Sequence, residues 1–358
     1  MRKNVEDEEL QKIVRILTKS VSLKLNNLWP KKFGYDLGTK AVEFVEGGKC
    51  IKGAQPFVES LRDELSGIKH KGRSIKEVDD YEIMFGEDIT CALYTLYIAW
   101  YYTRNIVDID LDFQRELDHG AKDGAQLRLS RDMFERLLGQ PIVFPIRYYE
   151  PSDDPNSPSY HFCFVGAVSD QDGRLSVYGA IIHYMENFGD GISIPKNFEM
   201  VVPLRLAYFD QGEEYIAFRE CESRVKNYEE NFEVGNEVVI TILSSTIYSL
   251  CDNDETSLWR STRYEPAIRK VKKGVKMFPP EQVNLMRVGQ DFGDEIRKFY
   301  REYPVGKTVT VQSNSNRTVR PHIRRGHWHL YWFGNRSQPD LMYTKLLWIS
   351  PTFVHSHE

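Results

Sequence analysis

The chain has 358 residues, of which 41% are hydrophobic, 28% charged and 13% aromatic, a composition typical of a soluble globular protein with many rings. A chain of this length can bury one large core or two medium ones. Residues 1–9 do not resemble a secretory signal peptide, and the longest apolar run, residues 89–103, is too short and too rich in tyrosine to span a bilayer. The five cysteines show no paired spacing, so we expect reduced thiols and a cytoplasmic protein without a membrane partner.

The net charge of −5 conceals an asymmetry along the chain. Residues 260–336 contain 17 Lys and Arg but only 6 Asp and Glu, so this stretch carries +11 and the remainder −16. One basic and one acidic part predict different partners for the two parts. For the basic cluster at residues 269–276, the other interpretation is a helix with a solvated charged face.

The N-terminal third is predicted to be mainly helical. Residues 7–25 form an amphipathic pattern, residues 41–45 predict a strand and residues 55–65 a short helix. Residues 89–104 are apolar nearly all round, which predicts a buried helix whose Trp100 belongs to the core.

The pattern changes after a helix predicted for residues 130–138. Four segments rich in β-branched and aromatic residues predict an antiparallel meander: residues 142–149, 159–168, 175–185 and 200–209. An apolar helix is then predicted for residues 236–251.

A further helix is predicted for residues 289–301, and residues 341–354 are typical of a strand that closes a sheet. The predicted fold class is therefore α+β. We divide it into a mainly helical N-terminal region, an antiparallel sheet with a buried helix, and a basic, mixed α/β C-terminal region closed by a terminal strand: residues 1–139, 140–258 and 259–358.

The most unusual composition in the chain is that of residues 320–334, Arg-Pro-His-Ile-Arg-Arg-Gly-His-Trp-His-Leu-Tyr-Trp-Phe-Gly, where arginine, histidine and aromatic residues are concentrated. Guanidinium groups suit phosphates and stack on rings, while aromatic side chains offer flat surfaces to bases. The candidate binding residues of this segment are Arg320, His322, Arg324, Arg325, His327, Trp328, His329, Tyr331 and Trp332. A supporting basic face is predicted from Arg297, Lys298, Arg301 and Arg317.

A strand that starts after Gly326 would separate these side chains into two rows, because successive side chains of a strand point to opposite faces. The row His327, His329 and Tyr331 would face a ligand or solvent. The row Trp328, Leu330 and Trp332 would be buried against the core.

Three interpretations of this segment compete. In the first, the arginines contact phosphates while His and Tyr rings stack on unpaired bases. In the second, His322, His327 and His329 bind a metal, although no cysteine or carboxylate cluster accompanies them. In the third, the segment is purely structural, with arginines stacked on tryptophans at a crowded junction.

Catalytic motifs are weak elsewhere. The chain has no complete phosphate-binding loop and no Gly-x-Ser-x-Gly elbow. Asp252, Asp254 and Glu255 are typical of a solvated turn. We therefore predict no catalytic residue, no cofactor and no metal, and keep RNA cleavage by His327, His329 and Tyr331 as the alternative.

Residues 320–334, together with Lys-Leu-Leu-Trp-Ile-Ser-Pro-Thr-Phe-Val at residues 345–354, resemble the C-terminal signature of the type V-A anti-CRISPR family, second subtype. Upstream, the buried helix at residues 89–104 and the helices at 236–251 and 289–301 fall in the order of that family. Members of the family are encoded by phages, plasmids and other mobile elements of bacteria.

The resemblance implies an inhibitor that lowers production of the type V-A RNA-guided nuclease. It implies recognition of the nuclease's N-terminal polypeptide during translation and loss of the encoding mRNA. The charge asymmetry suggests a division of labour, in which one part reads the peptide and the basic segment faces mRNA, the ribosome or a decay factor. The alternative is an RNA-binding or RNA-cleaving protein of a mobile element.

Overall fold

The computed structural model of the chain describes residues 14–16, 18, 96, 99–123, 127–146, 159–169, 172–185, 198–221, 236–272, 274–303, 321–335, 337–338 and 342–354. Helices and strands are both abundant in these residues, which confirms the α+β class. The strand predicted at 41–45 and the helix predicted at 55–65 lie outside them.

The two N-terminal helices that were predicted are described only in part. Residues 14–16 and 18 are helical, as are residues 96 and 99–103. Trp100 is fully buried and its indole Nε1 donates to the carbonyl of Asn105 at 2.9 Å, so its place in the core is confirmed.

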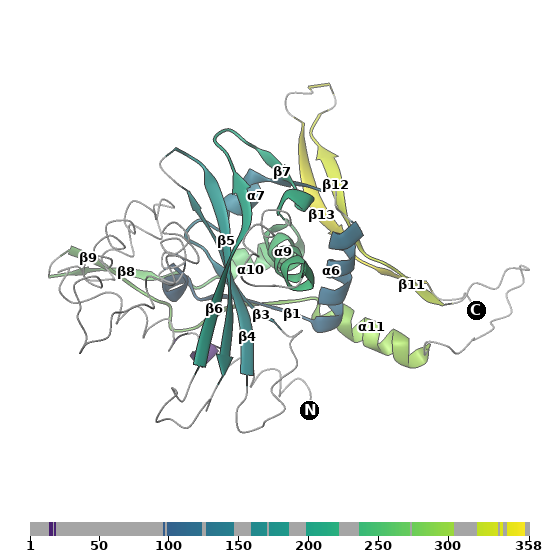
Figure 1. Ribbon diagram of the computed structural model, residues 1–358, viewed down its shortest axis with the longest axis horizontal. Coiled ribbons are helices and arrows are strands. Elements are labelled where there is room, and N and C mark those ends of the chain that lie inside the picture. The colour runs from purple at the N-terminus through teal and green to yellow at the C-terminus, as the bar shows by residue number, and fades with distance from the viewer. Residues whose placement is uncertain are drawn as a thin grey trace, which may run out of the picture.

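A six-stranded mixed sheet with the order β10-β1-β3-β4-β5-β6 forms the centre of the molecule (Figure 1). Its antiparallel part is the predicted meander: β3 (Ile142–Pro145), β4 (Ser159–Ser169), β5 (Leu175–Met185) and β6 (Phe198–Phe209). The meander is therefore confirmed, with a shorter first strand.

Two strands of this sheet are parallel and were not predicted. β1 (Asn105–Ile109) is buried along its whole length and pairs in parallel with β3 and with β10 (Asn284–Val288). The sheet thus takes strands from all three ranges into which the sequence was divided.

Short antiparallel pairs flank the sheet. β2 (Arg128–Ser130) pairs with β7 (Tyr215–Ala217), and β8 (Ala267–Val271) pairs with β9 (Gly274–Phe278). The basic cluster at residues 269–276 lies on the β8–β9 hairpin, so its interpretation as a helix face is wrong. The predicted helix at 130–138 is only α7 (Arg131–Glu135), with Ser130 as its N-cap.

Two helices, α9 (Asn236–Leu250) and α6 (Leu111–Asp123), pack on one side of the sheet (Figure 1). The predicted core helix is thus confirmed, and residues 239–250 of α9 are all buried. Its buried hydroxyls are satisfied within the helix: Ser249, for example, donates to the carbonyl of Ser245 at 2.7 Å.

A polar network joins α6 to α9. The carboxylate of Asp118 on α6 accepts hydrogen bonds from Gln114 Nε2 at 2.8 Å, Thr241 Oγ1 at 2.8 Å and Ser244 Oγ at 2.5 Å. Because buried polar groups are costly unless they are paired, this network fixes the position of α6 on α9.

The predicted helix at 289–301 is α11 (Gln290–Glu302). Two glycines allow it to approach the start of α6. A Cβ on Gly289, whose φ is +68°, would collide with Phe113, and a Cβ on Gly293 would collide with the carboxylate of Asp110.

Candidate functional site

The signature segment forms one arm of a long two-stranded ribbon. β11 (His322–Arg324) pairs with β14 (Thr352–Val354), and β12 (His327–Phe333) pairs with β13 (Tyr343–Ile349). Both pairings keep one antiparallel register, interrupted only at residues 325–326 opposite residues 350–351. We call residues 322–333 and 343–354 together the C-terminal ribbon. Its terminal strands pair with the signature strands and do not join the six-stranded sheet.

The inner face of the ribbon is anchored on α6 and α9. Trp328 is 6% exposed, and its ring centroid lies 5.1 Å from that of Trp348 and 6.3 Å from that of Tyr248. Gly120 of α6 and Gly326 leave room for the Trp348 ring, since a Cβ on either glycine would overlap it. Trp328, a predicted binding residue, is therefore a packing residue.

The face of the ribbon that is buried switches to the opposite side at the interruption at residues 325–326. On the β11–β14 part, Phe353 packs on Phe292 and Phe299 of α11, with centroid distances of 5.7 and 5.6 Å. Both Arg324 and Arg325 are exposed, although they are neighbours in sequence, and Gly326 is buried. The break in alternation thus puts two consecutive guanidinium groups on the outside.

The outer face carries the predicted row of rings. His327, His329 and Tyr331 are all exposed, and the residues between them are buried or half-buried, so the predicted alternation is confirmed from His327 to Tyr331. The centroids of His327 and His329 lie 6.4 Å apart, and those of His329 and Tyr331 4.3 Å apart. His322 is also exposed.

The tip of the ribbon projects beyond the helices (Figure 1). Trp332, which was predicted to be buried beside Trp328, is 67% exposed because no helix reaches that far along the ribbon. Phe333 and Tyr343 stack across the tip at a centroid distance of 5.8 Å and an interplanar angle of 18°. Both rings are exposed, and Lys345 Nζ lies 5.6 Å from the centroid of Phe333.

Asp252, Asp254 and Glu255 are exposed, as expected of a solvated segment, but the predicted turn is wrong for Asp254 and Glu255, which lie in a helix. α10 (Asp254–Thr262) begins here, and Asn253 and Thr256 form a capping box. The spacing of Asn253 and Thr256 and the acidic first turn, Asp254 and Glu255, are the sequence signals for this helix start.

Asp252 instead receives three cations. Its carboxylate accepts from Arg136 Nη1 at 2.7 Å and Arg260 Nη2 at 3.1 Å, and Lys345 Nζ of β13 lies at 3.4 Å. The hydrogen bond from Arg136 is the largest cause that holds the pKa of Asp252 below its ordinary value. This cluster ties the ribbon to the C-terminal end of α9, and sequence reasoning missed it.

The supporting basic face does not form as predicted. Arg297 Nη1 lies 2.9 Å from Asp110 Oδ2 and 2.8 Å from Asp112 Oδ2, and Nη2 lies 2.8 Å from Asp294 Oδ1. Burial opposes the charge of Arg297, but these hydrogen bonds outweigh it and raise the pKa of the guanidinium. The positive charge of Arg297 is thus already neutralised by three carboxylates. For this reason Arg297 does not contribute to a binding face for anions.

Two of the other supporting residues lie on α11 and not on the ribbon. Lys298 and Arg301 are exposed on α11, where Lys298 Nζ is 4.0 Å from Glu302. Arg317 and Arg320 lie outside the described residues.

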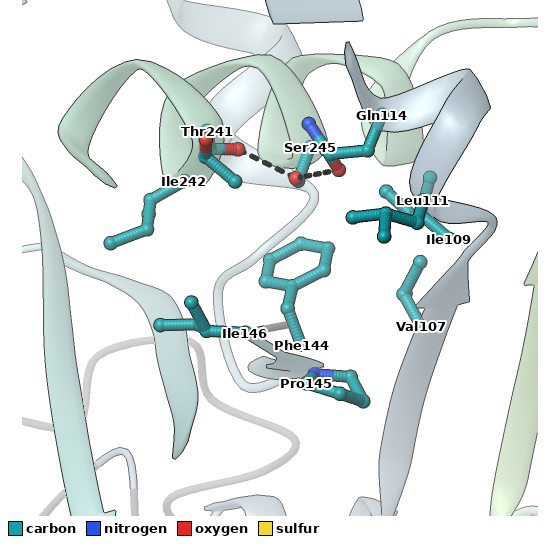
Figure 2. Close-up of a pocket in the computed structure, with 10 residues that line it drawn as sticks. All are labelled: Val107, Ile109, Leu111, Gln114, Phe144, Pro145, Ile146, Thr241, Ile242 and Ser245. Atoms are coloured by element: carbon teal, nitrogen blue, oxygen red, sulfur yellow. Dashed lines mark hydrogen bonds between the residues drawn. The ribbon is translucent and has the colours of Figure 1, made fainter. Parts of the chain in front are cut away.

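A small cavity lies between β1, β3 and α9 (Figure 2). Val107, Phe144 and Ile242 line it, and the Ser245 hydroxyl lies 2.7 Å from Gln114 Oε1 at its edge. Its volume of about 20 Å³ holds about one water molecule, whereas pockets for small ligands measure roughly 300 Å³ or more. This cavity is therefore not a substrate site.

The described residues show neither a metal-binding cluster nor a membrane-spanning helix. They contain no group of three or more His, Cys, Asp or Glu side chains arranged to hold a metal ion. None of their helices is long and apolar enough to cross a bilayer. Cys163, Cys221 and Cys251 are buried free thiols, and burial raises the pKa of Cys251 to about 12.

Comparison with known families supplies the assignment. A model of the AcrVA2-like family, described as the anti-CRISPR type V subtype A2 family, matches residues 125–356, more than half of the chain. The protein belongs to the AcrVA2-like family. The range matched by this anti-CRISPR family contains the whole C-terminal ribbon, the Asp252 cluster and the meander. Comparisons with curated proteins and with solved structures gave no match.

Proposed function

We propose that this AcrVA2-like protein inhibits a type V-A RNA-guided nuclease by lowering its production in the cytoplasm of a bacterial host. It recognises the nascent N-terminal polypeptide of the nuclease and causes loss of the encoding mRNA. Membership of the anti-CRISPR type V subtype A2 family supports the target system.

The observation that carries the proposal is the open outer face of the ribbon. His327, His329 and Tyr331 are exposed there beside Arg324 and Arg325, on a protruding element that the family match includes. An exposed surface on a protruding element suits a macromolecule, because small ligands bind in concave sites. The ribbon therefore acts toward the message or the translation and decay machinery.

We assign the peptide-reading role to another part of the molecule. The chain outside residues 260–336 carries a balance of −16, and residues 1–124 lie outside the family match. A part that differs from the family pattern is suited to selecting a particular target, while the matched part performs the common step.

The test separates recognition of the peptide from recognition of the RNA. Reporter messages begin with codons for the N-terminal segment of the nuclease, and their levels are measured in bacteria with and without the protein. A synonymously recoded message keeps the peptide but changes the RNA, and we expect it to be lost. A frameshifted message keeps nearly the same RNA but changes the peptide, and we expect it to persist.

Loss of the frameshifted message would contradict the proposal. It would favour RNA cleavage, in which His327 and His329, with ring centroids 6.4 Å apart, move protons at a phosphodiester. Cleavage of that kind requires no nascent peptide.

A further inference from the structure

The outer face of the C-terminal ribbon has the composition and ring spacing of a stacking surface. We propose that it binds single-stranded RNA, with bases on the rings of His329 and Tyr331 and on that of His327, and with phosphates at Arg324 and Arg325. The identification of that RNA as the message under translation rests on the function proposed above. The proposal of a stacking surface does not depend on that function.

The rings form two platforms along the strand, one shared by His329 and Tyr331 and one at His327. His329 and Tyr331 lean together at 4.3 Å with an interplanar angle of 44°, and His327 stands 6.4 Å from His329. At the tip, Phe333 and Tyr343 add a stacked pair. Tyr331 is 38% exposed, so part of its ring is accessible to a base.

The spacing favours unpaired bases over a duplex. Alternate residues of a strand repeat at roughly 6.6–6.8 Å. Successive bases in one strand of a duplex advance by only about 3.4 Å and are stacked on each other. Bases must separate from one another to lie on successive platforms, and only a single strand allows this at low cost.

Charge favours an anionic occupant over a neutral or basic protein surface, and the rings favour RNA over an acidic peptide because bases stack on them. The described residues between 321 and 354 include Arg324, Arg325 and Lys345 but no Asp or Glu. Lys345 pairs with Asp252, whereas Arg324 and Arg325 are exposed, so their guanidinium groups are accessible to phosphates. Cations beside rings and away from carboxylates are the combination that nucleic acid requires.

Binding of the purified full-length protein to a labelled single-stranded oligouridylate is measured by fluorescence anisotropy over a range of salt concentrations. Tyr331→Ala is expected to weaken binding roughly 5- to 150-fold, because it removes one stacking ring, without changing the salt dependence. Tyr331→Phe keeps the ring and is expected to bind like the parent. Tyr264→Ala, which removes an exposed ring outside the ribbon, is the matched control.

Substitution of the two arginines is expected to change the salt dependence of binding, unlike substitution of Tyr331. Arg324→Ala combined with Arg325→Ala is expected to lower the slope of log affinity against log salt by about 1.4, or about 0.7 for each lost phosphate contact. Arg301→Ala, at an exposed arginine of α11, is expected to leave that slope unchanged.

The inference would be overturned by no binding of RNA by the parent protein, by equal affinity of the parent and Tyr331→Ala, or by equally good competition by duplex RNA of matched length. Competition by the N-terminal peptide of the nuclease would also overturn it, since the face would then be a protein site. These measurements contain no ribosome and no nuclease message. If the RNA-binding inference fails, the recoded-message experiment therefore still tests the proposed function independently.

Discussion

At the scale of single residues, the sequence shows which side chains are charged but not which opposite charges they pair with. Arg297 was assigned to a basic face, yet its carboxylate partners Asp110 and Asp112 lie 187 and 185 residues away in the chain. Asp110 also accepts from the backbone N–H of Asp112 at 2.9 Å and therefore caps α6. Only the fold brings the start of α6 next to α11.

We expect Arg297→Met to lower the free energy of unfolding by about 1–3 kcal/mol, because the nearly buried Asp110 carboxylate loses its cation. Urea unfolding followed by far-UV circular dichroism measures the change. Lys298→Met removes an exposed cation from the same helix and should change stability by no more than about 0.5 kcal/mol. Equal effects of the two substitutions would show that Arg297 is an ordinary surface charge.

At the scale of elements, the strands of the meander and the alternation along β12 could be predicted because their patterns are local. The parallel strands β1 and β10 could not, since each is only five residues long and pairs with a distant segment. The alternation failed at Trp332, because burial depends on whether a helix covers that position.

The attachment of the ribbon depends on the fit between Gly326 and the ring of Trp348. A Cβ at position 326 would overlap that ring and lie 2.8 Å from Pro351 Cδ. We expect Gly326→Ala to destabilise the protein by about 1–3 kcal/mol through overpacking, as measured by urea unfolding followed by tryptophan fluorescence.

Trp348→Phe provides the control, because it frees space at the same contact. The double variant should be more stable than the sum of the two single effects predicts, by about 0.5–3 kcal/mol. Additive effects would mean that Gly326 does not act through the Trp348 ring.

At the scale of the whole molecule, the ribbon is packed against helices on its inner face and exposed on its outer face. The ring of Trp328, the Asp252 cluster and α11 each fix one part of it. The sequence indicated this segment as the candidate site because its composition is so improbable. It could not separate anchoring residues such as Trp328 from exposed ones such as Tyr331, because that distinction arises from packing between distant elements.

The charge asymmetry belongs to this scale as well. A basic region of +11 and a remainder of −16 support two surfaces with different partners. In the proposed function these are a nascent polypeptide and its message, which translation presents together.

The most direct measurement is the half-life of the nuclease message in cells that produce the protein with Arg324→Ala and Arg325→Ala. Both side chains are exposed, so folding should be unaffected, and Arg301→Ala serves as the control. We predict that the half-life returns to its value in cells without the protein, while the variant still co-purifies with ribosomes that translate the nuclease N-terminus. A message that decays as fast as with the unchanged protein would contradict the account.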